Sequence, residues 1–354
     1  MIDALNITIK QIGNSRISEF DQDNLVFGKT YSDHMFVADY KDGEWTDFKI
    51  EPYADLSLSP ANAALHYGQS IFEGLKAHRS ANGDVLVFRP EENAKRLNRS
   101  AKRMCIPEIP EEIFMQGLHE LLKLDSAWVP DRAGTSLYIR PFIFALDPYI
   151  GIRPSETYKF IIFTAPVGAY YAEPVRVKIE TSYTRAVKGG TGAAKTAGNY
   201  AAALYPAVKN QKSGYHQLIW TDGQTHEYIE ESGTMNVMFL IGDKLVTAPI
   251  GDTILQGITR HSVLTLARDW GVTVEERPVK VAEVVEAAAN GTLKEAFGAG
   301  TAATIAHIKA IGYDGTDYEL PAIHDQMLSV RIMQALTDIK TGAIEDKHHW
   351  IFKV

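Results

Sequence analysis

Cysteine is nearly absent from this sequence, since Cys105 is the only one among 354 residues. A lone cysteine excludes a framework of internal disulfides and favours a reducing compartment, and we expect Cys105 to fill space in the core. Long apolar runs are also absent, because no stretch approaches the roughly 20 residues that cross a bilayer. Residues 1–10 have no cationic stretch followed by an apolar one, so we expect a cytoplasmic protein with no membrane partner.

Positive charge is in the minority, with 36 Lys and Arg residues against 44 Asp and Glu residues and a formal net charge of -8. No run of Lys or Arg forms a basic stripe, so the sequence disfavours nucleic-acid binding and favours small molecules as partners. The adjacent His348 and His349 lack a spaced set of further ligands, and we predict no metal site.

The remaining composition is that of an ordinary globular protein, with 45% hydrophobic and 23% charged residues, and the length suits about two domains. Apolar strand-like runs alternate with helical patterns, so both halves should mix helix and sheet. The clearest strand-like runs are 85–88, 159–163 and 217–220, and the clearest helical patterns are 90–104, 111–124 and 255–270. Two prolines and a glycine between 165 and 174 predict a domain linker in that region.

Lys195 stands in a segment, 189–200, whose residues from six before it to four after it are all Gly, Ala, Thr or Asn. Small residues let a bulky planar partner approach the backbone, and no carboxylate in the segment holds the ammonium group. This setting suits an amine that reacts with a carbonyl group. The same composition is also typical of a flexible surface turn with a solvated lysine, and the segment alone does not decide between the two.

Residues 189–196 also read G-x-x-x-x-A-K-T, which differs at Ala194 from the phosphate-binding P-loop of NTPases. A P-loop directly follows a buried strand, whereas 175–180 alternates apolar and charged residues, as a half-exposed strand does, and residues 181–188 intervene. The apolar run that ends in Asp147 precedes the segment, although the magnesium-binding strand usually follows it. An NTPase therefore remains a minor alternative.

Three segments downstream of Lys195 are able to hold an anion or a charged ring. Glu230 and Glu231 stand before small polar residues at the entrance of a predicted strand. The helix start at 255–260 offers free amides to a phosphate, and the glycine-rich segment 297–304 offers amides and hydroxyls to an anion. Each is weak alone, since acidic turns and plain helix starts are common. Together with Lys195 they are the components of a pyridoxal phosphate site.

Several motifs in one order then relate the whole chain to a family. The sequence closely resembles the branched-chain amino acid aminotransferases, which are fold type IV pyridoxal phosphate enzymes. The matching blocks are 66–77, 88–90, 96–107, 136–141, 189–200, 231–236, 257–259 and 297–302.

The resemblance implies which residues hold the cofactor, pyridoxal 5′-phosphate. Lys195 would attach the cofactor and carry the proton of the substrate α-carbon, and Glu231 would pair with the pyridine nitrogen and favour the protonated, electron-withdrawing ring. Tyr200 would hydrogen-bond the phenolic oxygen. The other cofactor contacts, mainly to the phosphate, would come from Arg96, Thr234, Gly257, Ile258, Thr259 and Thr301.

The resemblance also implies the reaction, in which an amino group passes between leucine, isoleucine or valine and 2-oxoglutarate. One pocket would accept an apolar side chain in one half-reaction and glutamate in the other, with Arg140 on the side-chain carboxylate of glutamate. The apolar wall would comprise Phe72, Tyr138, Tyr170 and, from the neighbouring subunit, Ile152. The α-carboxylate would be held by Tyr67 and by the backbone of Thr301 and Ala302.

The implied fold has two domains, one α+β and one α/β. A small α+β domain would cover 1–168, a linker 169–182, and a larger α/β domain, with a sheet partly closed into a barrel, 183–354. Because a loop at 149–152 would complete the neighbour's pocket, the resemblance implies a homodimer or a higher homo-oligomer that acts on amino acids and 2-oxo acids.

Two features bear on rival assignments. Residues 303–306 lack the Cys-x-x-Cys pair of some animal members, so no thiol control is expected there. The D-amino acid and aminodeoxychorismate enzymes of the same fold share the lysine and the carboxylate, but they would be shorter and lack the blocks around Tyr67 and Arg140.

Overall fold

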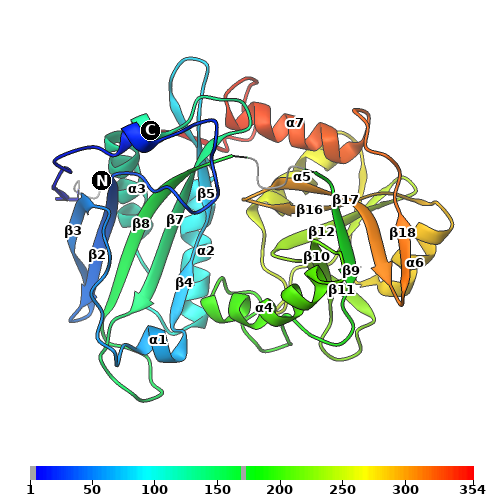
Figure 1. The fold of residues 1–354 in the computed structure, drawn as a ribbon, viewed down its shortest axis with the longest axis horizontal. Helices are drawn as coiled ribbons and strands as arrows, with labels where there is room; N and C mark the ends of the chain where they lie inside the picture. Colours follow the sequence, from blue (N-terminus) through cyan, green and yellow to red (C-terminus); the bar gives the residue numbers. More distant parts are fainter. Residues whose placement is uncertain (1–4, 169–172) are drawn as a thin grey trace. The chain divides into compact units, whose positions relative to one another are not determined.

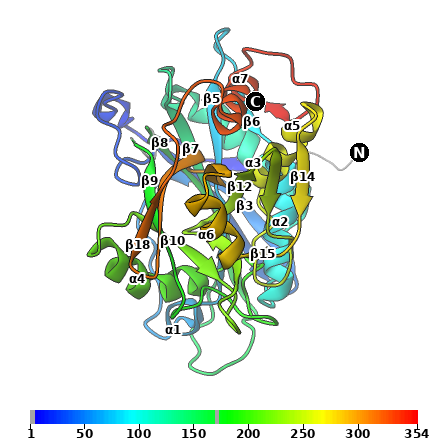
Figure 2. The ribbon, with the colours of Figure 1, turned by 90° about the vertical axis from the view of Figure 1, so that its right-hand side faces the viewer.

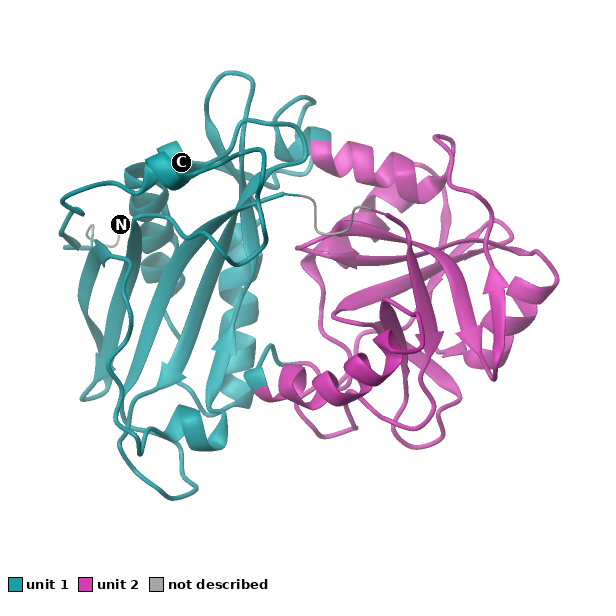
Figure 3. Ribbon diagram, viewed as in Figure 1, with its two compact units in different colours: residues 1–170, 194–197, 338–354 teal, residues 171–193, 198–337 magenta. Residues whose placement is uncertain are grey.

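The computed structural model describes residues 5–168 and 173–354. The chain divides into two compact units, shown in separate colours in Figure 3. Unit 1 comprises residues 1–170, 194–197 and 338–354, and unit 2 comprises 171–193 and 198–337. The expected linker lies partly outside the described residues. The expected large domain at 183–354 is wrong at two places, because 194–197 and 338–354 belong to unit 1.

Unit 1 is built on one nine-stranded sheet, in the order β1-β3-β2-β8-β7-β5-β6-β19 with β4 beside β7 (Figure 1). Its strands are β1 (Thr8–Ile9), β2 (His34–Lys41), β3 (Glu44–Pro52), β4 (Ser70–Phe72), β5 (Leu75–Arg79), β6 (Val85–Phe88), β7 (Ser136–Ala145), β8 (Tyr158–Val167) and β19 (Ile351–Lys353).

Helices cover one face of this sheet. The principal ones are α2 (Pro90–Arg103) and α3 (Glu111–Leu124), and both were predicted from their apolar periodicity. Leu97 of α2 and Phe114 of α3 pack with Phe36, Ile139 and Phe160 of the sheet in one buried cluster. Burying large apolar side chains in this way contributes about 1.5–3 kcal/mol for each.

The opposite face carries different side chains, because neighbours along a strand point to opposite sides of a sheet. In β7, Leu137 and Ile139 join the cluster under the helices. Tyr138 and Arg140 therefore lie on the face away from α2 and α3. The strand β5 alternates in the same way, with Lys76 between the buried Leu75 and Ala77.

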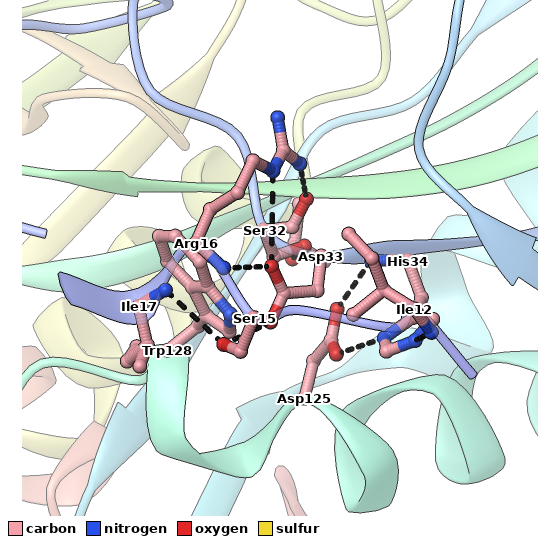
Figure 4. Close-up of polar contacts among 10 residues, drawn as sticks. Ile12, Ser15, Arg16, Ile17, Ser32, Asp33, His34, Asp125 and Trp128 are labelled. Carbon is pink, nitrogen blue, oxygen red and sulfur yellow. Dashed lines mark hydrogen bonds and ion pairs between the residues drawn. The ribbon is translucent and has the colours of Figure 1, made fainter. Parts of the chain in front are cut away.

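A polar cluster fastens the segment before β2 to this unit (Figure 4). Asp33 accepts the Arg16 N–H at 2.9 Å, and the Nδ1 of His34 lies 2.5 Å from Asp125. The Nε2 of His34 accepts the Ile12 N–H at 2.9 Å, so the ring proton is on Nδ1. Burial opposes ionisation of Asp33, yet its hydrogen bonds outweigh burial and lower its pKa.

The C-terminal segment belongs to unit 1 because β19 pairs with β6. Phe352 lies opposite Val87 in this antiparallel pair, which adds an edge strand to the sheet. A second expectation is also wrong, since Cys105 is exposed rather than buried in the core. Its φ of 53° lies in the left-handed region, where the chain turns after α2.

Unit 2 is a partly closed barrel, as expected, and Figure 2 views it from the side that carries α6 and β18. Its ten-stranded sheet has the order β14-β13-β12-β16-β17-β9-β10-β11-β15, with β18 beside β17. An additional pairing of β11 with β12 closes six of the strands into a ring. The strands are β9 (Val175–Ile179), β10 (Gln217–Thr221), β11 (Tyr228–Ser232), β12 (Met235–Ile241), β13 (Lys244–Thr247), β14 (Thr273–Glu276), β15 (Val279–Lys280), β16 (Leu293–Gly300), β17 (Thr304–Tyr313) and β18 (Thr316–Glu319).

The longer helices of the second half are α4 (Ala197–Gln211), α5 (Ile258–Asp269), α6 (Val281–Ala289) and α7 (Leu328–Lys340). Within the described ranges, no helix combines the length and the apolar character that a membrane crossing requires. The fold class expected from the sequence, two domains of mixed α and β structure with a barrel-like sheet, is confirmed.

Candidate active site

Backbone contacts within unit 1 hold the lysine segment in place. The Lys195 N–H donates to Ser100 Oγ of α2 at 2.9 Å, and the Lys195 carbonyl accepts the Phe72 N–H of β4 at 3.0 Å. Thr196 forms a β-bridge with Ile71 and donates its hydroxyl to the Ser70 carbonyl at 2.7 Å. Because these contacts use main-chain atoms, the position of Lys195 does not depend on its own side chain. A loosely held surface turn is therefore excluded.

The Lys195 side chain shares an aromatic ring with Arg140. The Lys195 Nζ lies 4.8 Å from the centroid of the Phe72 ring, and the Arg140 guanidinium carbon lies 4.7 Å from the same centroid. Arg140 Nη2 also donates to Tyr138 Oη at 3.1 Å. Unit 1 thus brings together four of the predicted residues: an amine, a guanidinium, a phenol and an apolar ring.

Gly74 permits the close approach of Tyr138 to the start of β5. A Cβ atom at this position would lie 2.1 Å from Tyr138 Oη, which is far inside the van der Waals contact distance. Only glycine lets the hydroxyl that contacts Arg140 occupy this place.

A buried carboxylate that sequence reasoning missed also belongs to this group. Glu73 is fully buried, and its two oxygens accept hydrogen bonds from Arg96 Nε at 2.7 Å and Arg96 Nη2 at 2.8 Å. Burial alone would raise the pKa of Glu73, but the charge and hydrogen bonds of Arg96 and the charge of Lys195 lower it. Arg96, predicted to bind the phosphate, is thus oriented through two of its nitrogens. The signal in the sequence was a carboxylate between the apolar residues of β4 and β5.

Unit 2 holds the second group of predicted residues around Glu231. This side chain is 3% exposed, and its Oε1 accepts the Leu255 N–H at 2.8 Å and Asn236 Nδ2 at 3.2 Å. Arg185 Nε lies 3.0 Å from Glu231 Oε2. Arg185 and Asn236 were not singled out from the sequence, although Asn236 stands in the 231–236 block.

Strand alternation separates the two adjacent glutamates. Both lie in β11, where neighbouring side chains point to opposite faces. Burial raises the pKa of Glu230, although the nearby Arg185 charge lowers it in part. Only Glu231 of the pair lines a cavity of about 220 Å³ within unit 2. Tyr200 of α4, Thr234 and Arg185 line the same cavity.

Two turns and a helix start gather at one end of the barrel beside this cavity. Asn236, at the start of β12, pairs with both Glu231 and Ala299. The end of β16 therefore places the turn at 301–303 next to the turn at 233–234. Within the glycine-rich segment 297–304, residues 297–300 are strand and only 301–303 form the turn.

The helix α5 begins at this same end, and its first residues are buried. Gly257 is the N-cap and gives no side-chain cap, while Ile258 and Thr259 are 7% and 5% exposed. A Cβ at Gly257 would lie 1.9 Å from Asn236 Oδ1, so glycine is required for this packing. Uncapped amides at a helix N-terminus form a ready site for a phosphate.

Of the predicted residues that the structure describes, Tyr67 and Ile152 lie apart from these groups. Tyr67 ends α1 (Ala63–Tyr67) with 41% of its surface exposed, and Ile152 is 94% exposed. Tyr170 lies outside the described residues. In the described part of the chain, no group of His, Cys, Asp or Glu residues is arranged to hold a metal ion.

The sequence of this chain is similar to those of known aminotransferases. Residues 70–311 match the family model for amino-transferase class IV. The branched-chain-amino-acid aminotransferase 2 of Bacillus subtilis is 45% identical over 338 residues, which cover 94% of this chain and 93% of the relative. The chain therefore belongs to the class IV aminotransferases and, within them, to the branched-chain-amino-acid aminotransferases.

Solved structures give the same result. The branched-chain aminotransferase of Thermoproteus uzoniensis, determined with norvaline, aligns with a TM-score of 0.75 at 26% identity and covers 90% of this chain and 99% of that one. The Escherichia coli branched-chain amino acid aminotransferase aligns with a TM-score of 0.72 at 28% identity over 90% and 98% of the two chains. The NTPase alternative is therefore wrong, and the half-exposed pattern of β9 already disfavoured it.

Pyridoxal 5′-phosphate is the cofactor of this family, and the residues present fit it. Unit 1 supplies the amine of Lys195, and the cavity of unit 2 offers the buried carboxylate of Glu231 and the phenol of Tyr200. The uncapped start of α5 suits the phosphate. Each unit by itself thus offers groups of the kind that this cofactor requires.

Proposed function

We propose that this chain transfers the amino group of leucine, isoleucine or valine to 2-oxoglutarate, and that it works as a cytoplasmic homodimer. The observation that carries the proposal is the pairing of Lys195 and Arg140 on one ring. An amine able to move a proton and a guanidinium able to bind a carboxylate lie on Phe72 at 4.8 and 4.7 Å from its centroid. Such a pair suits a substrate that reacts at one end and can carry a carboxylate at the other.

Different residues of the chain have different roles in the reaction. When bound, pyridoxal phosphate supplies a ring that withdraws electrons from the substrate α-carbon. Lys195 would take the proton from the α-carbon of the amino donor, and in the second half-reaction it would return a proton to the α-carbon of the acceptor. Glu231 would favour a proton on the pyridine nitrogen, since a buried carboxylate favours a cation beside it. Arg185 and the Leu255 amide orient the carboxylate of Glu231.

Substrate binding is assigned to the face of the sheet that carries Tyr138 and Arg140. The Phe72 ring and the aromatic face of Tyr138 suit an apolar side chain, and the guanidinium above them suits a distal carboxylate. Arg140 Nε is buried and has no hydrogen-bond partner among the residues that the structure describes. A buried unsatisfied donor costs free energy that an incoming carboxylate would recover.

Replacement of Arg140 by Met tests this assignment. The apolar wall remains in Arg140→Met, so the half-reaction with leucine should keep most of its rate. The half-reaction with glutamate should lose about 1.5 to 3 kcal/mol, the range for a hydrogen bond to a charged group, or roughly ten- to a hundredfold. Single-turnover changes in cofactor absorbance measure each half-reaction separately.

Arg140→Lys is the matched control, because it keeps the charge but not the planar fork. Its glutamate rate should fall between those of the wild type and Arg140→Met. An equal loss with leucine and glutamate would show that Arg140 supports the structure and does not bind the distal carboxylate.

The proposal of a homodimer is supported by an exposed apolar patch on unit 1. The patch comprises Leu65, Tyr67, Tyr149, Ile150 and Ile152, which are between 41% and 94% exposed. The two segments that carry the patch, α1 and the loop after β7, are neighbours (Figure 1). Asn62, which precedes α1, forms a β-bridge with Pro148 of that loop. Contiguous exposed apolar residues mark protein–protein contacts, and a two-fold dimer is the commonest homo-oligomer.

Ile152→Asp should shift the protein from dimer towards monomer in light scattering, and transamination should fall with it. A buried unpaired charge costs several kcal/mol at an interface. Ile344→Asp is the control, because Ile344 is an exposed apolar residue of unit 1 outside the patch. Wild-type protein that is monomeric at micromolar concentration would contradict the proposal.

A further inference from the structure

Three basic side chains gather on the face of the unit 1 sheet that points away from α2 and α3. Lys76 and His78 alternate along β5 with the buried Leu75 and Ala77. Lys340 is the last residue of α7, and its Nζ lies 5.1 Å from the ring centroid of Phe88. Lys340 is only 6% exposed. We call Lys76, His78 and Lys340 the basic cluster.

The basic cluster shares its face with the residues assigned to the substrate. Lys76 lies directly opposite Tyr138 in the register of β5 and β7, so their side chains stand on the same side. Phe88, which contacts Lys340, lies in β6 on the other side of β5. Neighbouring strands are about 4.8 Å apart, which puts β6, the strand of Phe88, roughly 10 Å from β7, the strand of Tyr138 and Arg140.

The charge of the cluster changes near neutral pH. Burial, and then the charge of Lys76, lower the pKa of Lys340 to about 7. Burial lowers the pKa of Lys76 to about 8. Burial and the two lysines lower the pKa of His78 to about 3, so His78 is neutral under ordinary conditions. The two lysines therefore carry the charge, which falls as the pH rises from 6 to 9.

Other charged groups lie on the elements around this face. Asp84, before β6, pairs with Lys353 of β19 at 2.7 Å. The Arg89 guanidinium lies over the Trp350 ring at 5.3 Å. The remaining charged side chains on these elements are Arg79 of β5, Arg331 and Asp338 of α7, and Arg140 of β7. On this face, Lys340 and Lys76 are the groups whose pKa values burial lowers to about 7 and about 8.

We propose that Lys340, acting with Lys76, is a specificity-determining residue that strengthens the binding of dicarboxylate substrates relative to monocarboxylate ones. The inference rests on the proposed function, because it needs a distal carboxylate at Arg140. Glutamate and 2-oxoglutarate carry one more negative charge than leucine and its 2-oxo acid. A charge on the order of 10 Å away changes the affinity for that extra carboxylate about three- to tenfold at an effective dielectric of about 25 to 50, between those of a protein site and of water. Lys340 acts through the field and does not touch the substrate.

The test compares two unreactive ligands of the pyridoxal phosphate form of the dimer. Glutarate carries two carboxylates and 4-methylpentanoate carries one, and all are ionised above pH 6. Their dissociation constants are measured by calorimetry at pH 6.5 and 8.5. The ratio of the two constants removes any titration that affects both ligands equally.

The wild type should bind glutarate about three- to tenfold more tightly at pH 6.5 than at pH 8.5, relative to 4-methylpentanoate. Lys340→Met should lose most of this pH dependence and weaken glutarate by a similar factor at pH 6.5. Lys340→Arg should bind glutarate tightly at both pH values, because a guanidinium stays charged. Lys347→Met is the control, since it removes an exposed lysine of the same C-terminal segment.

Equal weakening of both ligands in Lys340→Met, or a flat ratio in the wild type, would overturn the inference. If Lys340→Met does not fold, the wild-type pH profile and Lys340→Arg decide the question, because a structural role would not give a charge-dependent ratio. A wild type that transaminates 2-oxoglutarate with a flat ratio rejects this inference alone. A wild type that does not transaminate 2-oxoglutarate rejects the proposed function instead.

Discussion

Lys195→Ala should fold, retain the shape of the site and lose transamination by at least about 100- to 10,000-fold, the range for the loss of a positioned general base. Folding should survive because the contacts of Lys195 with Ser100 and Phe72 use its backbone atoms, which alanine keeps. The reaction should fail because the described residues around Phe72 offer no second amine at that position. Turnover with leucine and 2-oxoglutarate measures the loss.

A matched variant separates the chemical loss from any general effect of removing a lysine. Lys188 lies in the same loop and is exposed, so Lys188→Ala should keep wild-type turnover. A small primary amine added to Lys195→Ala should restore part of the activity, because it supplies the missing base. Turnover within tenfold of the wild type in Lys195→Ala would remove Lys195 from its assigned role.

The spacing of apolar residues along the sequence correctly predicted several helices and strands whose burial depends on that spacing. The helix predicted at 111–124 is α3, with bounds Glu111–Leu124, because its apolar residues repeat at helical spacing and bury themselves on the sheet. The run 85–88 is β6 for a similar reason. The alternation at 175–180 correctly predicted a half-buried strand, since β9 alternates buried and partly exposed side chains.

Long-range pairing was beyond the reach of the sequence pattern. Lys195 stands in the second half of the chain, yet its segment pairs with β4 and belongs to unit 1. The C-terminal segment likewise joins unit 1 through β6. In both cases the free energy comes from contacts with residues more than a hundred positions away, which no local periodicity records.

Electrostatic partners were missed for the same reason. No carboxylate stands near Lys195 in the sequence, but the fold brings the charge of Glu73 close enough for Lys195 to lower its pKa. Arg185 was passed over because a single arginine in a polar stretch resembles a solvated one, whereas the structure pairs it with Glu231. The resemblance to a family named the reacting residues, and the fold identified the residues that orient them.

Glu231→Gln should keep the cofactor but lower turnover on the order of 100-fold. The amide oxygen can still accept the hydrogen bonds from the Leu255 amide and Asn236 that Glu231 Oε1 accepts. The amide has no charge to favour a proton on the pyridine nitrogen, and each unit lost from the pKa of that nitrogen corresponds to a factor of ten. Turnover per bound cofactor is the quantity to measure, because it excludes any loss of cofactor affinity.

The neighbouring glutamate provides the control for this prediction. Glu230→Gln changes the same chemical group one residue away on the opposite face of β11, so its turnover per cofactor should stay within about threefold of the wild type.

Glu231→Gln also leaves Arg185 without its carboxylate partner. This loss should lower the free energy of unfolding, measured by denaturant titration, by about 3 kcal/mol. If turnover per cofactor is unchanged while stability falls, Glu231 anchors Arg185 and does not act on the pyridine ring. If both fall in Glu231→Gln and neither falls in Glu230→Gln, the carboxylate of Glu231 both anchors Arg185 within unit 2 and acts on the pyridine ring.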